Sequence, residues 1–132
     1  MGYQFVEHVG EVEVELEAAS EAGIFAAALD AFAELVERDS TGGSVLSQEV
    51  ELEAHDCALL LVDWVSELVF LAEVACFVPD RVTQLTVAGG KLHAIVEGHH
   101  DHPRHLVKAV TLNRLELEQR GDEWHGRVVL DV

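Results

Sequence analysis

Hydrophobic and polar residues alternate in several short stretches of this chain, and the alternation predicts β-strands. In residues 11–17 glutamates occupy the odd positions and apolar residues the even ones. Because successive side chains of a strand point to opposite faces, this pattern is typical of a strand with one buried face. Residues 49–53 repeat the pattern and residues 3–8 follow it more weakly. We therefore interpret the following glutamates as solvated strand faces: Glu13, Glu15, Glu17, Glu49, Glu51 and Glu53.

A longer period of three and four residues predicts a first helix. Ser20 is a suitable N-cap, and apolar residues recur at offsets of four, three and four from Phe25 to Val36. This spacing places them on one face of an amphipathic helix that ends near Arg38. The polar and glycine-containing residues 40–44 predict the loop that follows.

A second helix is predicted from Asp56, a suitable N-cap, to about Cys76. Its apolar residues nearly encircle it. Such a helix normally lies at the centre of the core or is covered by another chain. We expect Trp64 to belong to the core for this reason.

The rest of the chain predicts strands and turns. Strands are expected at residues 81–87, 91–97, 107–119 and 124–132, with turns at Gly89-Gly90 and Gly121-Asp122. The order strand, helix, strand, helix, then strands predicts an α+β fold. We expect one domain over residues 1–132, with a mixed, mostly antiparallel sheet and two helices packed on one of its faces.

The charge is divided unevenly along the 132 residues. Residues 1–80 contain 18 acidic residues and one basic residue, Arg38, whereas residues 81–132 contain seven of each, so the first part accounts for the whole net charge of −17. Binding to nucleic acid requires cationic groups that displace counterions from phosphates. The charge therefore argues against strong direct binding of RNA, and favours a basic protein partner or divalent cations.

The two thiols and the start of the sequence predict that the protein is cytoplasmic. Cys57 and Cys76 form no CxxC motif, and both are predicted on the second helix. Residues 1–5 lead into an acidic strand without the basic and then apolar pattern of a leader. The longest apolar stretch, residues 59–78, carries three acidic residues, which argues against a membrane span.

Two groups of residues are candidates for chemistry. Residues 99–105 contain four histidines and Asp101, which suggests a zinc-binding loop, but they lack a cysteine and the HExxH spacing. A solvated loop is the simpler interpretation, and metal binding there stays open. Glu7 and His8 could form an acid–base pair, although neither a nucleophile nor a phosphate-binding loop accompanies them.

Four stretches resemble the archease family. They are YQFVEHVGE at residues 3–11, LLVDWVSEL at 60–68, DHPRH at 101–105 followed by VKAVT at 107–111, and RVVLDV at 127–132. The family's first strand usually leads into aspartate-histidine-threonine-alanine-aspartate. His8 matches this motif, Glu7 and Glu11 stand where the two aspartates usually stand, and residues 9–10 depart from it.

The resemblance implies a cytoplasmic, non-enzymatic accessory protein. Proteins of this family promote guanylylation and turnover of an RtcB-type RNA ligase in tRNA splicing or RNA repair, and they hold a divalent cation. Carried over to this sequence, the cation ligands are Glu11, Asp131 and Val132, and Lys108 matches a lysine needed for activity. Calcium is the expected ion, with magnesium or manganese as alternatives, because hard cations take oxygen ligands.

Two other functions stay open from the sequence. One is a small metal-dependent hydrolase that uses Glu7, His8 and the histidines of residues 99–105. The other is an acidic module that binds a protein partner or forms a homo-oligomer. Turnover of model phosphoesters by the isolated protein would favour the hydrolase, and stimulation of a ligase would favour the accessory protein.

Overall fold

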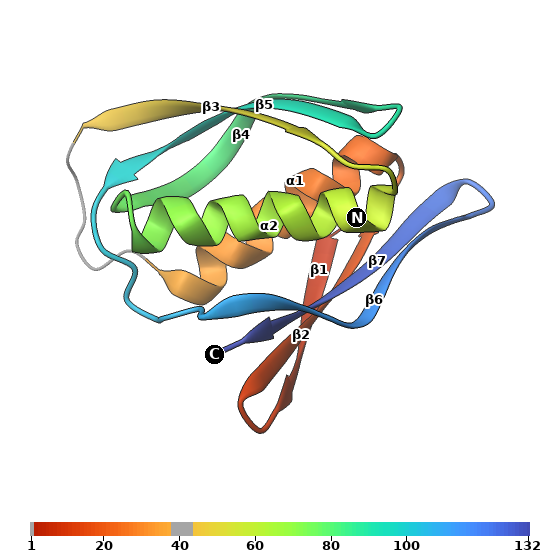
Figure 1. The fold of residues 1–132 in the computed structure, drawn as a ribbon, viewed down its shortest axis with the longest axis horizontal. Helices are drawn as coiled ribbons and strands as arrows, with labels where there is room; N and C mark the ends of the chain where they lie inside the picture. The colour runs from red at the N-terminus through yellow and green to blue at the C-terminus, as the bar shows by residue number, and fades with distance from the viewer. Residues whose placement is uncertain (1, 38–43) are drawn as a thin grey trace.

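A computed structural model describes residues 2–37 and 44–132 of the chain. Its helices and strands follow one another in the order that the sequence predicts, with a run of strands after the second helix (Figure 1). The elements of the described residues are β1 (Gly2–His8), β2 (Glu11–Ala18), α1 (Glu21–Val36), β3 (Val45–Glu53), α2 (Cys57–Glu73), β4 (Phe77–Ala88), β5 (Lys91–His100), β6 (Ala109–Arg120) and β7 (Glu123–Asp131).

The strands form two antiparallel sheets with the two helices between them (Figure 1). One sheet has the order β1-β2-β7-β6 and the other has the order β3-β5-β4. This arrangement confirms the predicted α+β class, and each sheet carries the helices on one face. The division into two sheets was not predicted, because alternation shows which face of a strand is buried but not which strand lies beside it.

Helix α1 follows its predicted pattern closely. The Ser20 hydroxyl accepts a hydrogen bond from the Gly23 amide at 3.0 Å, which caps the helix. The residues at the predicted offsets from Phe25 to Val36 are all buried. Of the predicted loop after this helix, residues 40–43 lie outside the described residues.

Helix α2 contacts both sheets, which bury most of its apolar residues, whereas Leu59 and Phe70 stay exposed. The Asp56 carboxylate accepts a hydrogen bond from the Ala58 amide at 2.6 Å and caps the helix as predicted. Trp64 is fully buried, and its Nε1 donates to the Phe25 carbonyl oxygen at 2.9 Å, which joins the two helices. Among the described residues, no helix is long and apolar enough to cross a membrane.

The prediction that Cys57 and Cys76 share a helix is wrong. Cys57 begins α2, but the helix ends at Glu73. Cys76 has a φ of 54°, in the left-handed region, and the chain turns there into β4. The apolar residues 74–78 continue the helical pattern in sequence, so hydrophobicity alone does not reveal this reversal.

Strands β4 and β5 extend beyond their predicted ends. Strand β4 begins at Phe77 instead of residue 81, and β5 continues to His100 instead of residue 97. His99 and His100, expected in a loop, instead pair with Val78 and Phe77. The Gly89-Gly90 turn between the strands is confirmed, with φ values of 59° and 77° that favour glycine.

Candidate functional site

The main chain brings together the residues of the predicted cation site. Glu11 of β2 lies directly opposite Asp131 of β7 in the antiparallel register. The Val132 amide donates to the Gly10 carbonyl oxygen at 3.1 Å, so the end of β7 is held beside the turn between β1 and β2. The Lys108 amide donates to the Asp131 carbonyl oxygen at 2.8 Å. Residues from both ends of the sequence therefore meet at one end of the four-stranded sheet.

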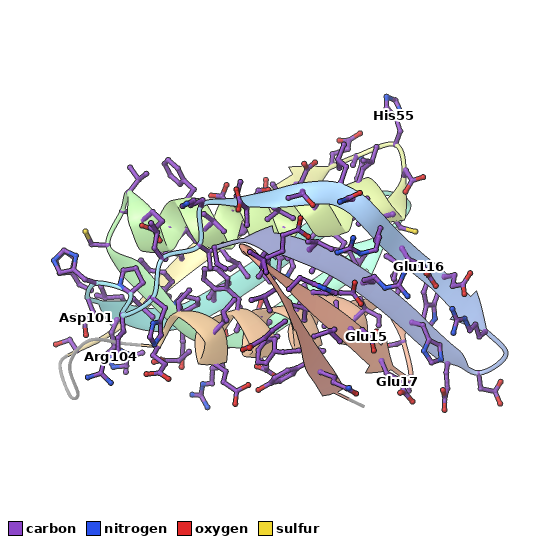
Figure 2. The ribbon with its side chains drawn as sticks, turned by 90° about the horizontal axis from the view of Figure 1, so that it is seen from below. Glu15, Glu17, His55, Asp101, Arg104 and Glu116 are labelled. Carbon is purple, nitrogen blue, oxygen red and sulfur yellow. The ribbon has the colours of Figure 1, made fainter. Side chains whose placement is uncertain are left out.

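Glu11 and Asp131 lie on the face of this sheet away from the helices. Directly paired residues of an antiparallel ladder project to the same side, and the neighbours Val12 and Leu130 are buried in the core. Figure 2 shows Glu15 and Glu17 of β2 on this outer face. We call it the outer face of the four-stranded sheet below.

Arg114 connects two glutamates across the outer face. Its Nε donates to Glu13 Oε1 at 2.9 Å and its Nη2 to Glu11 Oε2 at 3.1 Å. Arg114 has a φ of 55° and lies where the β6–β7 register is interrupted between Thr111 and Glu116. The hydrogen bond to Glu13, followed by that to Glu11, raises the pKa of the Arg114 guanidinium above its ordinary value.

Glu13 is buried, so the prediction that it is a solvated residue is wrong. Only 8% of its surface is exposed, and its Oε2 also lies 3.6 Å from Arg127 Nε. The arginines of β6 and β7 balance the charge of the buried carboxylate. The alternating stretch does not predict this burial, because the side chains that cover Glu13 belong to strands about one hundred residues later in the sequence.

His8 and Glu7 project to opposite faces of β1. His8 pairs with Glu11 and its Nε2 lies 4.0 Å from Glu13 Oε1, so it borders the outer-face cluster. Glu7 pairs with Val12, whose side chain points into the core side of the sheet. The two residues therefore do not converge as an acid–base pair would.

Lys108 also borders a groove beside helix α2. The groove has a volume of about 380 Å³ and is lined by the end of α2, including Phe70 and Glu73, and by the start of β6. Glu73 Oε1 is buried there and has no hydrogen-bond partner in the described part of the chain. Lys108 thus lies between the Asp131 main chain and an acidic, partly apolar groove.

The residues at the end of β7 suit a hard divalent cation. The proposed ligands Glu11, Asp131 and Val132 offer only oxygen atoms, which calcium and magnesium prefer. Within the described residues the Asp131 carboxylate has no hydrogen-bond or ion-pair partner. Glu11 has one oxygen bonded to Arg114, so a cation would share this carboxylate with a guanidinium.

The histidines of residues 99–105 point to separate partners. His99 Nδ1 lies 2.6 Å from Asp80 Oδ2, and His102 Nδ1 lies 3.7 Å from Cys76 Sγ. His105 Nε2 is 4.0 Å from Glu37 Oε2. Among the described residues, no three metal-binding side chains of this segment come together.

Comparison with known proteins identifies the family. The model of the archease protein family matches residues 3–132. This chain belongs to the archease family. It is 32% identical to protein archease of Methanosarcina acetivorans and 29% identical to that of Pyrobaculum neutrophilum, in each case over 98% of this chain and 95% of the relative.

Two solved structures share the archease fold. The solution structure of Methanobacterium thermoautotrophicum protein 1598 superposes with a TM-score of 0.75 at 22% identity, over 99% of both chains. The crystal structure of a Thermotoga maritima archease, described as a possible chaperone, gives a TM-score of 0.69 at 19% identity and covers 96% of this chain and 94% of that one. At these identities the likeness establishes the fold, and it confirms the predicted α+β architecture.

Proposed function

We propose that this archease is a non-enzymatic accessory factor that promotes guanylylation and turnover of an RtcB-type RNA ligase in the cytoplasm, during tRNA splicing or RNA repair. Family membership supports an accessory role, as does the description of the Thermotoga maritima relative as a possible chaperone. The observation that carries the proposal is the pairing of Glu11 with Asp131 beside Val132. This pairing gathers the residues at which the family resemblance places a cation.

Glu11, Asp131 and Val132 would hold the cation, with calcium the expected ion. A divalent cation supplies positive charge that neutralises the phosphates of a nucleotide. Lys108 supplies a second positive charge at the same end of the sheet, since its amide is bonded to the Asp131 carbonyl. His8 and Arg114 border the site: His8 Nε2 lies 4.0 Å from Glu13 Oε1, and Arg114 Nη2 donates to Glu11 Oε2 at 3.1 Å.

The charge of the surface fits a protein partner better than RNA. The net charge is −17, and most of the described arginines on the outer face already pair with glutamates. Few cations are therefore free to contact phosphates. An acidic accessory protein would approach the ligase through a basic face of that ligase.

The hydrolase alternative lacks support from the arrangement of its residues. Glu7 and His8 lie on opposite faces of β1, and the histidines of residues 99–105 bind separate partners. General acid–base chemistry requires its groups within hydrogen-bond reach of one reacting atom. We therefore assign the chemistry to the partner ligase and the cation site to this chain.

A guanylylation assay tests the proposal. The cognate RtcB-type ligase is incubated with labelled GTP, with and without this protein, and the covalent ligase–GMP complex is measured over time. Wild-type protein should raise the rate, whereas Asp131→Asn and Lys108→Ala should not. Glu53→Gln, which removes an exposed carboxylate from the other sheet, serves as the matched control and should behave as wild type. An unchanged rate with wild-type protein would contradict the proposal.

A further inference from the structure

A second group of metal-binding side chains lies on the three-stranded sheet. Glu51 of β3 pairs directly with His93 of β5, and Glu49 precedes Glu51 by one full strand period. All three side chains therefore project from the same face, away from the helices. One potential ligand atom from each lies within 4.8 Å of the others.

The distances suit a common metal ion after small side-chain movements. His93 Nε2 lies 2.7 Å from Glu49 Oε2. Zinc binds imidazole nitrogen and carboxylate oxygen at roughly 2.0–2.2 Å, so two ligands of a tetrahedral ion lie about 3.4 Å apart. Both glutamates are exposed, so their carboxylates can adjust by this amount without disturbing the core.

The surroundings of the cluster favour a cation and leave room for further ligands. Glu53 follows on the same face of β3 and Lys91 lies opposite it, so this part of the sheet carries three carboxylates and one ammonium group and is negative overall. Glu97, farther along β5, is already neutralised by Arg81 at 2.8 Å. The cluster also borders a surface hollow of about 560 Å³, lined in part by Glu51, Thr86 and His93.

We infer that Glu49, Glu51 and His93 form a binding site for a first-row transition-metal dication of the zinc class. Two carboxylates and one imidazole supply three protein ligands, and the adjoining hollow leaves a fourth position for water or a ligand from solution. The two sites differ in the metals that they should prefer. Imidazole suits zinc, copper or nickel, whereas the oxygen-only site at Asp131 suits calcium. The inference does not depend on the proposed action on a ligase.

Titration of the protein with metals tests the site. Protein freed of metal with a chelator is titrated with Zn²⁺ by calorimetry and with Co²⁺ by visible absorption, which reports nitrogen and oxygen ligands. The variants are His93→Gln and Glu51→Gln. His125→Gln is the matched control. His125 also lies on a strand, and its Nε2 is 3.2 Å from Glu123 Oε2. A second control, His102→Gln, removes the histidine that lies beside Cys76.

We expect one equivalent of Zn²⁺ to bind to wild type and to each control, His125→Gln and His102→Gln. The affinity should fall by about tenfold or more in His93→Gln and in Glu51→Gln. In wild-type protein, ¹⁵N spectra of the imidazoles should show the largest zinc-induced shift at His93, a result that does not depend on any variant folding. Failure of wild type to bind Zn²⁺ would overturn the site. Equal affinity in His93→Gln, or a larger shift at another histidine, would overturn it as well.

Discussion

Nη2 of Arg114 lies 3.1 Å from Oε2 of Glu11, so a guanidinium already neutralises one of the carboxylates proposed to bind a cation. The same side chain bonds Glu13, which is buried. Arg114 thus has two opposite effects: it stabilises the folded sheet, and it competes with a cation for Glu11.

The substitution Arg114→Met should separate these two effects. Calcium should bind more tightly, because a positive charge beside the site is removed, whereas the melting temperature without calcium should fall because Glu13 loses its nearest partner. Calorimetry and thermal melts measure the two quantities. Arg120→Met is the control, since Arg120 pairs with Glu116 and Glu118 instead of Glu11, and it should leave calcium affinity unchanged. Weaker calcium binding in Arg114→Met would show that the arginine organises the site.

Calcium should raise the stability of wild-type protein through Glu11 and Asp131. A cation that binds only the folded state adds about 2.7 kcal/mol to the free energy of unfolding at a hundredfold excess over Kd. Asp131→Asn and Glu11→Gln should lose most of the calcium-induced rise in melting temperature. Glu17→Gln, an exposed residue on the same face of β2, should retain it. Equal rises in all four proteins would place the cation elsewhere.

Gly98 should be intolerant of a side chain. A Cβ at this position would lie 2.7 Å from Phe77 Cζ and 3.0 Å from Pro79 Cα, and it would also overlap the Val78 carbonyl oxygen. We expect Gly98→Ala to lower the free energy of unfolding by about 2 kcal/mol or more, since overpacking a buried site against main chain forces β4 and β5 apart. At Gly126, the control, the nearest atom would be Ile24 Cγ2 at 3.4 Å. Urea titration should show a smaller loss for Gly126→Ala, and equal losses would contradict the explanation.

Cys57 should react slowly with thiol reagents at pH 8. Burial raises the pKa of its thiol, and the Glu21 and Asp56 carboxylates raise it further, so less thiolate is present than in a free cysteine. In a Cys76→Ser background, reaction with a chromogenic disulfide should be slower than that of glutathione and should accelerate as the pH rises. Glu21→Gln should speed the reaction at pH 8. A rate equal to that of glutathione would rule out the predicted pKa rise.

The local features of the fold could be predicted from the sequence. The alternation in residues 11–17 identifies β2, the offsets from Phe25 identify the buried face of α1, and Ser20 and Asp56 act as the expected caps. Each of these depends on residues within a few positions of one another. The end of α2 was missed because residues 74–78 stay apolar across the turn at Cys76.

Features that depend on the register between distant strands could not be predicted in the same way. The burial of Glu13 arises from Arg114 and Arg127, and the cluster of Glu49, Glu51 and His93 arises from the pairing of β3 with β5. Alternation gives the face of each residue but not its neighbour across the sheet. Glu11 and Asp131 were expected together chiefly because the sequence resembles the archease family, and the pairing of β2 with β7 places them opposite each other.

Multiple-turnover RNA ligation tests the central claim most directly. The cognate RtcB-type ligase is supplied with excess RNA ends and GTP, and this protein is added in amounts well below those of the ligase. We predict that wild-type protein and Glu53→Gln raise the number of ligation events per ligase, that Asp131→Asn does not, and that the protein alone joins no RNA. Ligation that is unchanged by wild-type protein, or stimulated equally by Asp131→Asn, would contradict the proposed role of the site.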